Sequence, residues 1–178
     1  MIYYDNVPFY SQFQDIPQVE WQSSACGIAS MAMVMEFYKP KSVSVSNLLL
    51  QALDLGAYKP GIGWKHKELS ALAGLYGLSG KNYDYMHLDN QTVFGKFKDF
   101  MKVGPVIVSI HNKFNPKATL GHIVVVTGME NGMIFYHDPA SGNKIEKKIS
   151  EADFLKGWKR RFIVVRAKTP VEIAKTAI

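Results

Sequence analysis

The sequence is poor in the residues that build disulfide and metal frameworks. Cys26 is the single cysteine, and the five histidines show no His-x-x-x-His spacing. One thiol excludes an internal disulfide framework and a multi-cysteine zinc or iron–sulfur site. A Gly-x-x-x-x-Gly-Lys segment is also missing, which leaves no nucleotide-binding loop of that type. We therefore expect neither a metal nor a cofactor.

Long apolar runs are absent as well. The most apolar stretches, residues 106–108 and 123–126, are strand-sized and far below the roughly 18–20 residues that span a bilayer. Residues 1–11 have no basic start followed by a continuous apolar segment, so no signal peptide is visible. We expect a protein without an integral membrane segment, cytoplasmic or, where a targeting segment has been removed, in the cell envelope or secreted.

Aromatic residues are scarce where basic residues gather. The net charge is +6, and the densest basic clusters, residues 144–148 and 156–161, contain Trp158 as their only aromatic side chain. That is too few for a single-strand stacking platform, and finger or helix-turn-helix patterns for reading a duplex are missing. We expect the excess lysine to form a solvated face and not a nucleic-acid site.

What the sequence contains is one globular domain over residues 1–178, with 47% hydrophobic and 20% charged residues. Its core is expected over about residues 7–166, with a peripheral tail from residue 168. Helical spacing dominates the first half and strand patterning the second, which predicts an α+β fold. Residues 2–10 suggest an edge strand or an extended arm. The expected helices cover residues 25–38 and 67–76, one capped by Ser44 or Ser46, one capped by Asp89 and a short one after Ser150, and the expected strands cover residues 106–111, 122–129, 133–137, 144–149 and 162–166.

Cys26 lies where a polar loop meets the first predicted helix, in the segment Ser-Ser-Ala-Cys-Gly-Ile-Ala-Ser. The unpaired N–H groups and the positive dipole at a helix N-terminus favour a thiolate over a thiol. Gly27 beside it allows another part of the chain to approach closely. A lone cysteine is also compatible with a small, buried apolar role. Its position at the junction, outside the apolar stripe, favours a nucleophile.

His122 begins the most apolar strand, in Gly-His-Ile-Val-Val-Val. A thiolate nucleophile needs a nearby imidazole to hold the proton and return it to the leaving amine. The alternative is a structural histidine at a strand end whose hydrogen bonds are satisfied within the core. Among the other histidines, His66, His87 and His111 lie in loops or at element ends with less constraint, and His137 lies in the next strand. We predict that His122 is the partner of Cys26.

Asp138 follows the next predicted strand, in His-Asp-Pro, and is the candidate to orient His122. Asn131-Gly132 predicts a hairpin between the two strands. A strict two-residue turn there would place Asp138 and His122 on different faces of the sheet. A three-residue loop at residues 129–131 would place them directly opposite each other, which is the register that the functional interpretation requires. Asp-Pro is also an ordinary turn signal.

Three blocks of the sequence resemble papain-like cysteine peptidases, and in particular the group related to bacteriocin-leader (double-glycine) peptidases. They are Val-Pro-Phe-Tyr-Ser-Gln at residues 7–12, Ala-Cys-Gly-Ile-Ala-Ser-Met-Ala-Met-Val at residues 25–34, and Gly-His at residues 121–122 together with Asp-Pro-Ala-Ser-Gly at residues 138–142. The order Cys, His, Asp is that of the family. The resemblance covers nearly the whole chain, roughly residues 7–165.

The resemblance implies a papain-like fold in which a helical half carries Cys26 and an antiparallel sheet carries His122 and Asp138. It also implies an oxyanion-hole glutamine, for which Gln12 matches the family block and Gln22 is the second choice. With neither membrane spans nor a nucleotide-binding domain, the chain looks like a stand-alone relative. The expected partner is a peptide or protein substrate.

The expected substrate groove runs between the helical half and the sheet. Residues 58–64 and 111–120 should border it, with Trp64 and Phe114 as candidate substrate contacts; for Trp64 a core position is the alternative. Lys113 and Lys117 suggest tolerance for acidic or neutral residues in the bound peptide. Besides hydrolysis, a transpeptidase or amide hydrolase on the same fold and a catalytically silent peptide-binding module remain open alternatives.

Overall fold

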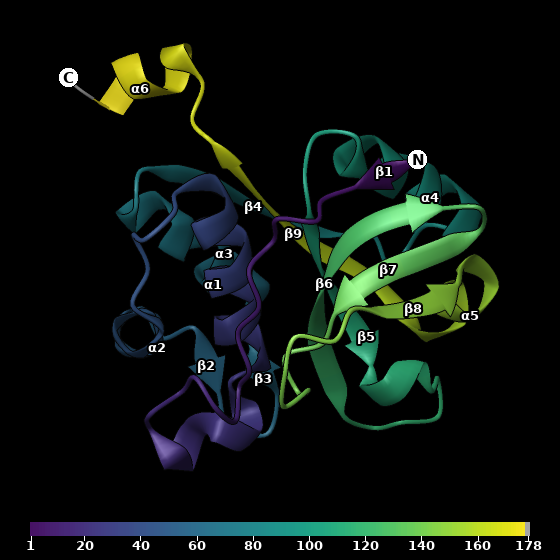
Figure 1. The fold of residues 1–178 in the computed structure, drawn as a ribbon, viewed down its shortest axis with the longest axis horizontal. Helices are drawn as coiled ribbons and strands as arrows, with labels where there is room; N and C mark the ends of the chain where they lie inside the picture. The colour runs from purple at the N-terminus through teal and green to yellow at the C-terminus, as the bar shows by residue number, and fades with distance from the viewer. Residues whose placement is uncertain (177–178) are drawn as a thin grey trace.

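The computed structural model describes residues 1–176, in which a group of helices lies beside an antiparallel sheet (Figure 1). The helices are α1 (Cys26–Tyr38), α2 (Val45–Asp54), α3 (His66–Leu75), α4 (Asn90–Met101), α5 (Glu151–Gly157) and α6 (Pro170–Thr176), with the 3-10 helices η1 (Val19–Ser24) and η2 (Asn112–Phe114). The strands are β1 (Ile2–Tyr3), β2 (Tyr58–Lys59), β3 (Gly63–Trp64), β4 (Leu78–Asp84), β5 (Val106–His111), β6 (Gly121–Glu130), β7 (Met133–His137), β8 (Lys147–Ser150) and β9 (Trp158–Ala167). This mixture confirms the predicted α+β class.

The sheet joins the two halves of the molecule. Its strands follow one another in the order β4, β9, β5, β6, β7 and β8, and β1 pairs with β6. All of these pairs are antiparallel. The strand β9 is longer than predicted because it pairs with β5 on one side and with the edge strand β4 on the other. It therefore runs from the sheet into the helical half, as Figure 1 shows.

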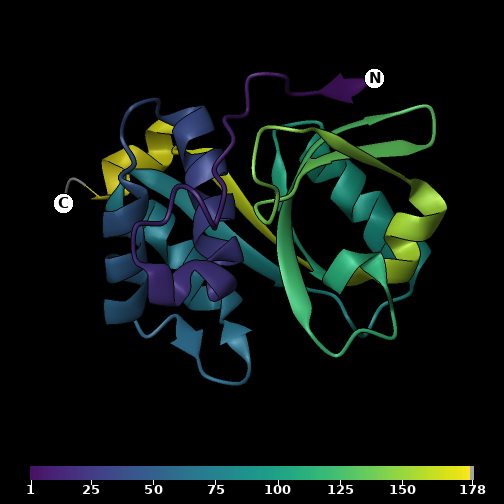
Figure 2. The same ribbon diagram turned by 60° about the horizontal axis from the view of Figure 1, so that its bottom comes forward.

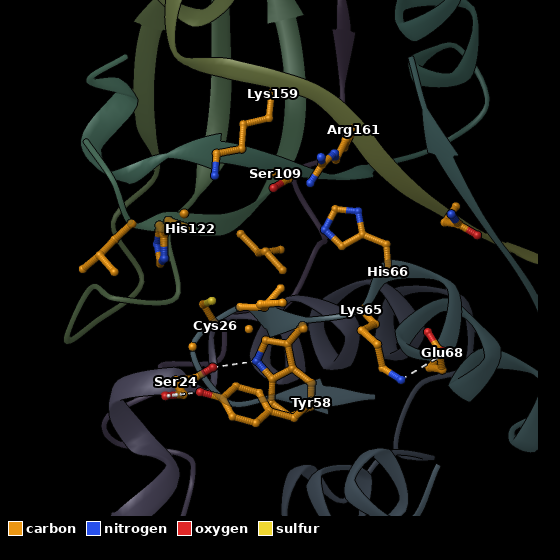
Figure 3. A pocket seen from close by; sticks show the side chains of 18 of the residues that line it. Ser24, Cys26, Tyr58, Lys65, His66, Glu68, Ser109, His122, Lys159 and Arg161 are labelled. Carbon is orange, nitrogen blue, oxygen red and sulfur yellow. Dashed lines mark hydrogen bonds and ion pairs between the residues drawn. The ribbon is translucent and has the colours of Figure 1, made fainter. Parts of the chain in front are cut away.

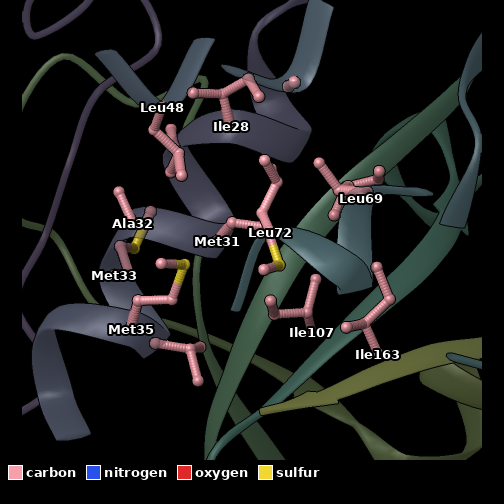
Figure 4. Packing of buried hydrophobic residues seen from close by; sticks show 14 of the residues in the cluster. Ile28, Met31, Ala32, Met33, Met35, Leu48, Leu69, Leu72, Ile107 and Ile163 are labelled. Atoms are coloured by element: carbon pink, nitrogen blue, oxygen red, sulfur yellow. The ribbon is translucent and has the colours of Figure 1, made fainter. Parts of the chain in front are cut away.

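Both faces of the sheet are buried, and neighbouring residues of one strand enter different cores. Ile107 and Ile163 pack with the apolar side chains of α1, α2 and α3 (Figure 4). Val106 and Val108 face the second core, which contains the buried side chains of α4 and α5. In Figure 2 these two helices lie on the side of the sheet away from α1, α2 and α3. Burial on both faces explains why residues 123–126 are continuously apolar.

Side-chain caps define three of the helix starts. Ser44 (and not Ser46), Asp89 and Ser150 each accept a hydrogen bond from the backbone N–H three residues further on. Each cap satisfies a donor that the first helical turn leaves unpaired. At the other end of the chain, α6 projects away from the sheet (Figure 1).

The strand β4 and the β2–β3 hairpin were not predicted from the sequence. β4 lies at the sheet edge with most of its side chains at least partly exposed, so its apolar residues do not alternate. It also contains Gly80, where a Cβ would collide with the carbonyl of Ser70 in α3. The glycine that weakens the strand pattern is thus the residue that lets β4 pack against the helix.

Candidate active site

Cys26 is the first residue of α1 and is partly exposed. The preceding residue, Ala25, provides no side-chain cap, so the N–H groups of the first turn are left without that partner. The chain that approaches Gly27 closely is β3: a Cβ on Gly27 would lie 2.8 Å from Cδ1 of Trp64. The indole N–H of Trp64 donates to the carbonyl of Ser24, with 2.6 Å between the two heavy atoms. These contacts fix the loop that leads into Cys26.

The structure brings Cys26, His122 and Asp138 together. Nε2 of His122 lies 2.7 Å from Oδ1 of Asp138, and Cys26 lies beside the imidazole, close enough to raise its pKa. Because Asp138 occupies Nε2, the nitrogen left for the sulfur is Nδ1. Side chains from the helical half and from the sheet thus meet at the boundary between them.

The turn between β6 and β7 differs from the register that the functional interpretation required. Asn131 and Gly132 have φ values of 49° and 73° and form a two-residue turn. The expected three-residue loop at residues 129–131 is therefore wrong. With this turn alone, Asp138 and His122 would project from different faces of the sheet.

A β-bulge at Thr127 restores the common face. Between the turn and the bulge, Gly128 pairs with Phe135, as a two-residue turn requires. Beyond the bulge, Val125 pairs with His137, whereas the turn alone would pair it with Asp138. Since side chains alternate along a strand, a shift of one residue moves Asp138 to the face of His122. The hydrogen bond between these two side chains depends on this extra residue.

Burial and charged neighbours together determine the ionisation of His122 and Asp138. Burial disfavours the imidazolium of His122, but its hydrogen bond to Asp138 and its interaction with Cys26 outweigh burial and raise its pKa to about 9. Burial also opposes ionisation of Asp138, yet its bonds to His122 and to Lys147 hold the pKa of this carboxyl well below its usual range. Nζ of Lys147 lies 2.9 Å from Oδ2 of Asp138, and the N–H of Ala140 donates to Oδ1. An imidazolium facing the sulfur is thus favoured at neutral pH.

The two glutamines have different environments. Gln12 is 3% exposed, and its backbone N–H donates to the carbonyl of Pro139, immediately after Asp138. One N–H of its side-chain amide donates to the carbonyl of Gln22, which leaves the second N–H of that nitrogen. The side chain of Gln22 donates to the carbonyl of Ile16, 2.9 Å away. The chain thus ties Gln12 to the loop that carries Asp138.

A cleft of about 610 Å³ opens beside Cys26 and His122, between the helical half and the sheet (Figure 3). Tyr58 and Trp64 line its helical side, and Trp64, 8% exposed, belongs to the first core as well. The second half of residues 111–120 reaches the cleft through Thr119 and Leu120.

The expected role of Phe114 as a substrate contact is wrong. It is not among the residues that line the cleft, and its ring packs against Tyr136 and Phe154 in the second core. Phe114 has a φ of 55° and lies so close to Gly157 that a Cβ there would collide with its backbone. Lys113 and Lys117 do not line the cleft either. The sequence showed an aromatic residue in a loop but could not show on which side of the sheet the ring packs.

Sequence reasoning also missed side chains that surround the pair. Lys147, which binds Asp138, comes from β8, and nothing in its local pattern indicates that partner. His66, set aside as an unconstrained histidine, begins α3 and lines the cleft. Burial and the charge of Arg161 lower the pKa of His66 to about 4, so it is a neutral imidazole at physiological pH. The contact of Lys147 with Asp138 depends on the pairing of β7 with β8, and His66 reaches the cleft only when the two halves pack.

The comparisons with known proteins identify a family and a fold. The sequence profile of the Peptidase_C39 like family matches residues 4–162. No curated protein matches the chain. A double glycine motif protease from an AMS/PCAT transporter, solved in complex with the leader peptide, is 24% identical with a TM-score of 0.56, covering 80% of this chain and 84% of that one.

Two further solved structures share the fold. A protein from Bacillus anthracis assigned as a C39-like peptidase has a TM-score of 0.64 at 16% identity, over 94% of this chain and 98% of its own. The peptidase domain of Streptococcus ComA, a bi-functional ABC transporter of a quorum sensing pathway, has a TM-score of 0.62 at 19% identity, over 86% and 97%. These likenesses confirm the papain-like fold of C39 peptidases. Within residues 1–176, no helix is long and apolar enough to cross a bilayer.

Proposed function

Because the chain belongs to the Peptidase_C39 like family, we propose that it is a cysteine peptidase in which Cys26, His122 and Asp138 hydrolyse peptide bonds through a thioester. The observation that carries the proposal is that Cys26 lies beside His122, whose Nε2 is hydrogen-bonded to Asp138. A nucleophile, a base within hydrogen-bond reach and a third group that orients the base are the parts that nucleophilic catalysis needs.

The proposed reaction assigns one step to each atom of this chain. Sγ of Cys26 attacks the carbonyl carbon, and the resulting oxyanion is stabilised by the N–H of Cys26 and by the free side-chain N–H of Gln12. The C–N bond then breaks, and the leaving amine takes the proton from Nδ1 of His122. Water attacks the thioester as His122 accepts its proton, and the C–S bond breaks to release the acid and the thiol.

The fixed contacts of the pair support this assignment. Nε2 of His122 is held by Asp138, so Nδ1 faces the sulfur in both halves of the reaction. Gln12 is favoured over Gln22 because its backbone is bonded to Pro139 beside Asp138, whereas the amide of Gln22 is bonded to Ile16.

The test is digestion of a mixed peptide library by the wild type and by Cys26→Ala, read by mass spectrometry in water enriched with oxygen-18. We expect cleavage by the wild type alone, with the heavy oxygen in the new carboxyl group. Cleavage that persists in Cys26→Ala would contradict the proposal, and products joined to added amines would indicate transfer instead of hydrolysis.

A second measurement tests the pair without a substrate. His122→Ala should lower the rate at which iodoacetamide alkylates Cys26 at pH ~6, because the imidazolium stabilises the thiolate. His87→Ala, which removes an exposed histidine outside the cleft, is the matched control. A wild-type rate no faster than that of free cysteine would favour a catalytically silent peptide-binding module.

A further inference from the structure

Lys159 is a cation beside the candidate site that the proposed chemistry does not use. It comes from β9, and its Nζ would lie 2.8 Å from a Cβ placed on Gly121, the neighbour of His122. In Figure 3 its ammonium group points into the cleft toward His122. Among residues 1–176 it has no hydrogen-bond or ion-pair partner. Burial and the charge of Arg161 lower the pKa of Lys159, so an anion beside it would be stabilising.

The other cations of the cleft are paired or exposed. Nζ of Lys65 lies 3.3 Å from the carboxylate of Glu68, and Nε of Arg161 lies 3.1 Å from the carboxylate of Asp84. Lys67 lines the cleft but is exposed. The uncompensated charge that is partly shielded from water, next to His122, is therefore that of Lys159.

Two neutral hydrogen-bonding groups face the same space. Ser109, from β5, is 8% exposed and lines the cleft, and its hydroxyl has no partner within the described chain. The ring of His66 likewise has no hydrogen bond within residues 1–176, and Figure 3 shows it across from Ser109 and Arg161. A buried hydroxyl without a hydrogen-bond partner destabilises the protein, and a hydrogen bond to a ligand oxygen would remove that cost.

The direction of a bound substrate follows from the proposed function. Its oxyanion points to Gln12, and its leaving nitrogen lies against the ring of His122. The cleft opens away from Gln12 and Asp138, neither of which lines it, and the acyl half is assigned to this space. An extended peptide advances about 3.4 Å per residue. A side chain one or two residues before the scissile bond therefore reaches the region of Lys159.

We propose that Lys159, Ser109 and His66 form a subsite for the carboxylate of an acidic side chain in the acyl half of the substrate, one or two residues from the scissile bond. The proposal rests on the proposed function and narrows its substrate class to acidic peptides. Lys159 provides the charge, while Ser109 and the neutral His66 provide hydrogen bonds without adding a second charge.

The experiment uses covalent probes, which do not require the natural substrate. Acetylated dipeptide vinyl sulfones carry Glu or Gln at the first or the second position before the electrophile, with Gly at the other. The thiolate of Cys26 adds to the vinyl group, whose neighbouring carbon takes up a proton. The second-order labelling rate is measured by mass spectrometry for the wild type, for Lys159→Met and for Lys117→Met, a matched change at an exposed lysine outside the cleft.

For at least one position we expect the Glu probe to label the wild type about tenfold faster than the Gln probe, because the carboxylate of Glu pairs with the ammonium group of Lys159 and the neutral amide of Gln does not. Lys159→Met should reduce this ratio to near one, and Lys117→Met should retain it. Using the ratio within each variant cancels general changes in thiol reactivity.

The failure of this proposal can be told apart from that of the proposed function. Rapid alkylation by iodoacetamide with a Glu-to-Gln ratio near one at both positions would overturn the subsite alone. An unreactive Cys26 would overturn the proposed function. In that case, NMR titration of Cys26→Ala with acetyl-Glu-Gly-amide and acetyl-Gln-Gly-amide tests the subsite directly, and equal affinities would reject it.

Discussion

Asp138 receives hydrogen bonds from three groups, and His122 is only one of them. Lys147 occupies its second carboxylate oxygen, and Ala140 shares the first. These contacts prevent the carboxylate from rotating. The positive charge of Lys147, however, partly cancels the negative charge by which Asp138 stabilises the imidazolium of His122. Lys147 therefore has two opposite effects on His122: it fixes the orientation of the Asp138 carboxylate, and it weakens the electrostatic stabilisation that this carboxylate provides.

We expect substitutions of Asp138 and of Lys147 to shift the pH profile of activity in opposite directions. The alkaline limb of kcat/KM should lie near pH 9, where His122 loses its proton. Asp138→Asn removes the counter-charge and should move the limb toward 6.5, with a loss of turnover on the order of 100-fold or more. Lys147→Met should move it upward. A downward shift in Lys147→Met would mean that Lys147 acts mainly by orienting the carboxylate.

At the scale of elements, the contact between α1 and β3 shapes one side of the cleft. Gly27→Ala places a methyl group against the indole of Trp64 and the side chain of Leu69. We expect it to destabilise the fold by about 1–3 kcal/mol, because overpacking forces neighbours to move. Urea denaturation measures this change.

The control for this prediction is Gly95→Ala in α4, where a Cβ meets nothing within 4 Å. An alanine in an exposed helix interior is favoured over glycine by up to about 1 kcal/mol, so this variant should gain stability. Equal effects of the two substitutions would show that the close approach of Trp64 to Gly27 has no energetic consequence.

Elements with a local signal were predictable, whereas contacts that depend on pairing were not. The helix beginning at Cys26 and the Asn131-Gly132 turn follow from short-range chemistry. The bulge at Thr127 has no such signal, because it is defined by a neighbouring strand. His122 and Asp138 were therefore expected side by side, as their hydrogen bond has them, but with the wrong turn to join their strands. Lys159 was not predicted as a site residue for the same reason, because the sequence does not show that its strand borders the cleft.

At the scale of the whole molecule, ionisation at the site contributes to the stability of the fold. The pKa of His122 is about 9 in the folded chain and 6.5 in its ordinary state, so the stabilisation is fully present below pH 6.5 and is lost as the pH rises through about 9. Asp138, whose pKa is lowered, acts oppositely: its contribution is present above its ordinary 3.8 and disappears at lower pH.

We therefore expect the free energy of unfolding of the wild type to fall between pH 6.5 and 9.5 by at most about 3 kcal/mol, since one pKa unit corresponds to about 1.4 kcal/mol. His122→Ala should lack this part of the decline, and His87→Ala should retain it. Urea denaturation at pH 6.5, 8 and 9.5 provides the comparison. Parallel curves for the wild type and His122→Ala would show that the ion pair does not contribute to folding.

The positions of the three candidate catalytic residues along the chain have a consequence for the order of folding. His122 and Asp138 are separated by 16 residues and belong to one hairpin, which can close within microseconds. Cys26 lies in the other half and reaches them only after the helices dock on the sheet, a slower event because it joins distant segments. During synthesis α1 emerges long before β6, so its thiol spends that time without a base. Rapid alkylation of Cys26 would then report the completion of folding, and the chain would acquire its capacity to cut other polypeptides only as its last large contact forms.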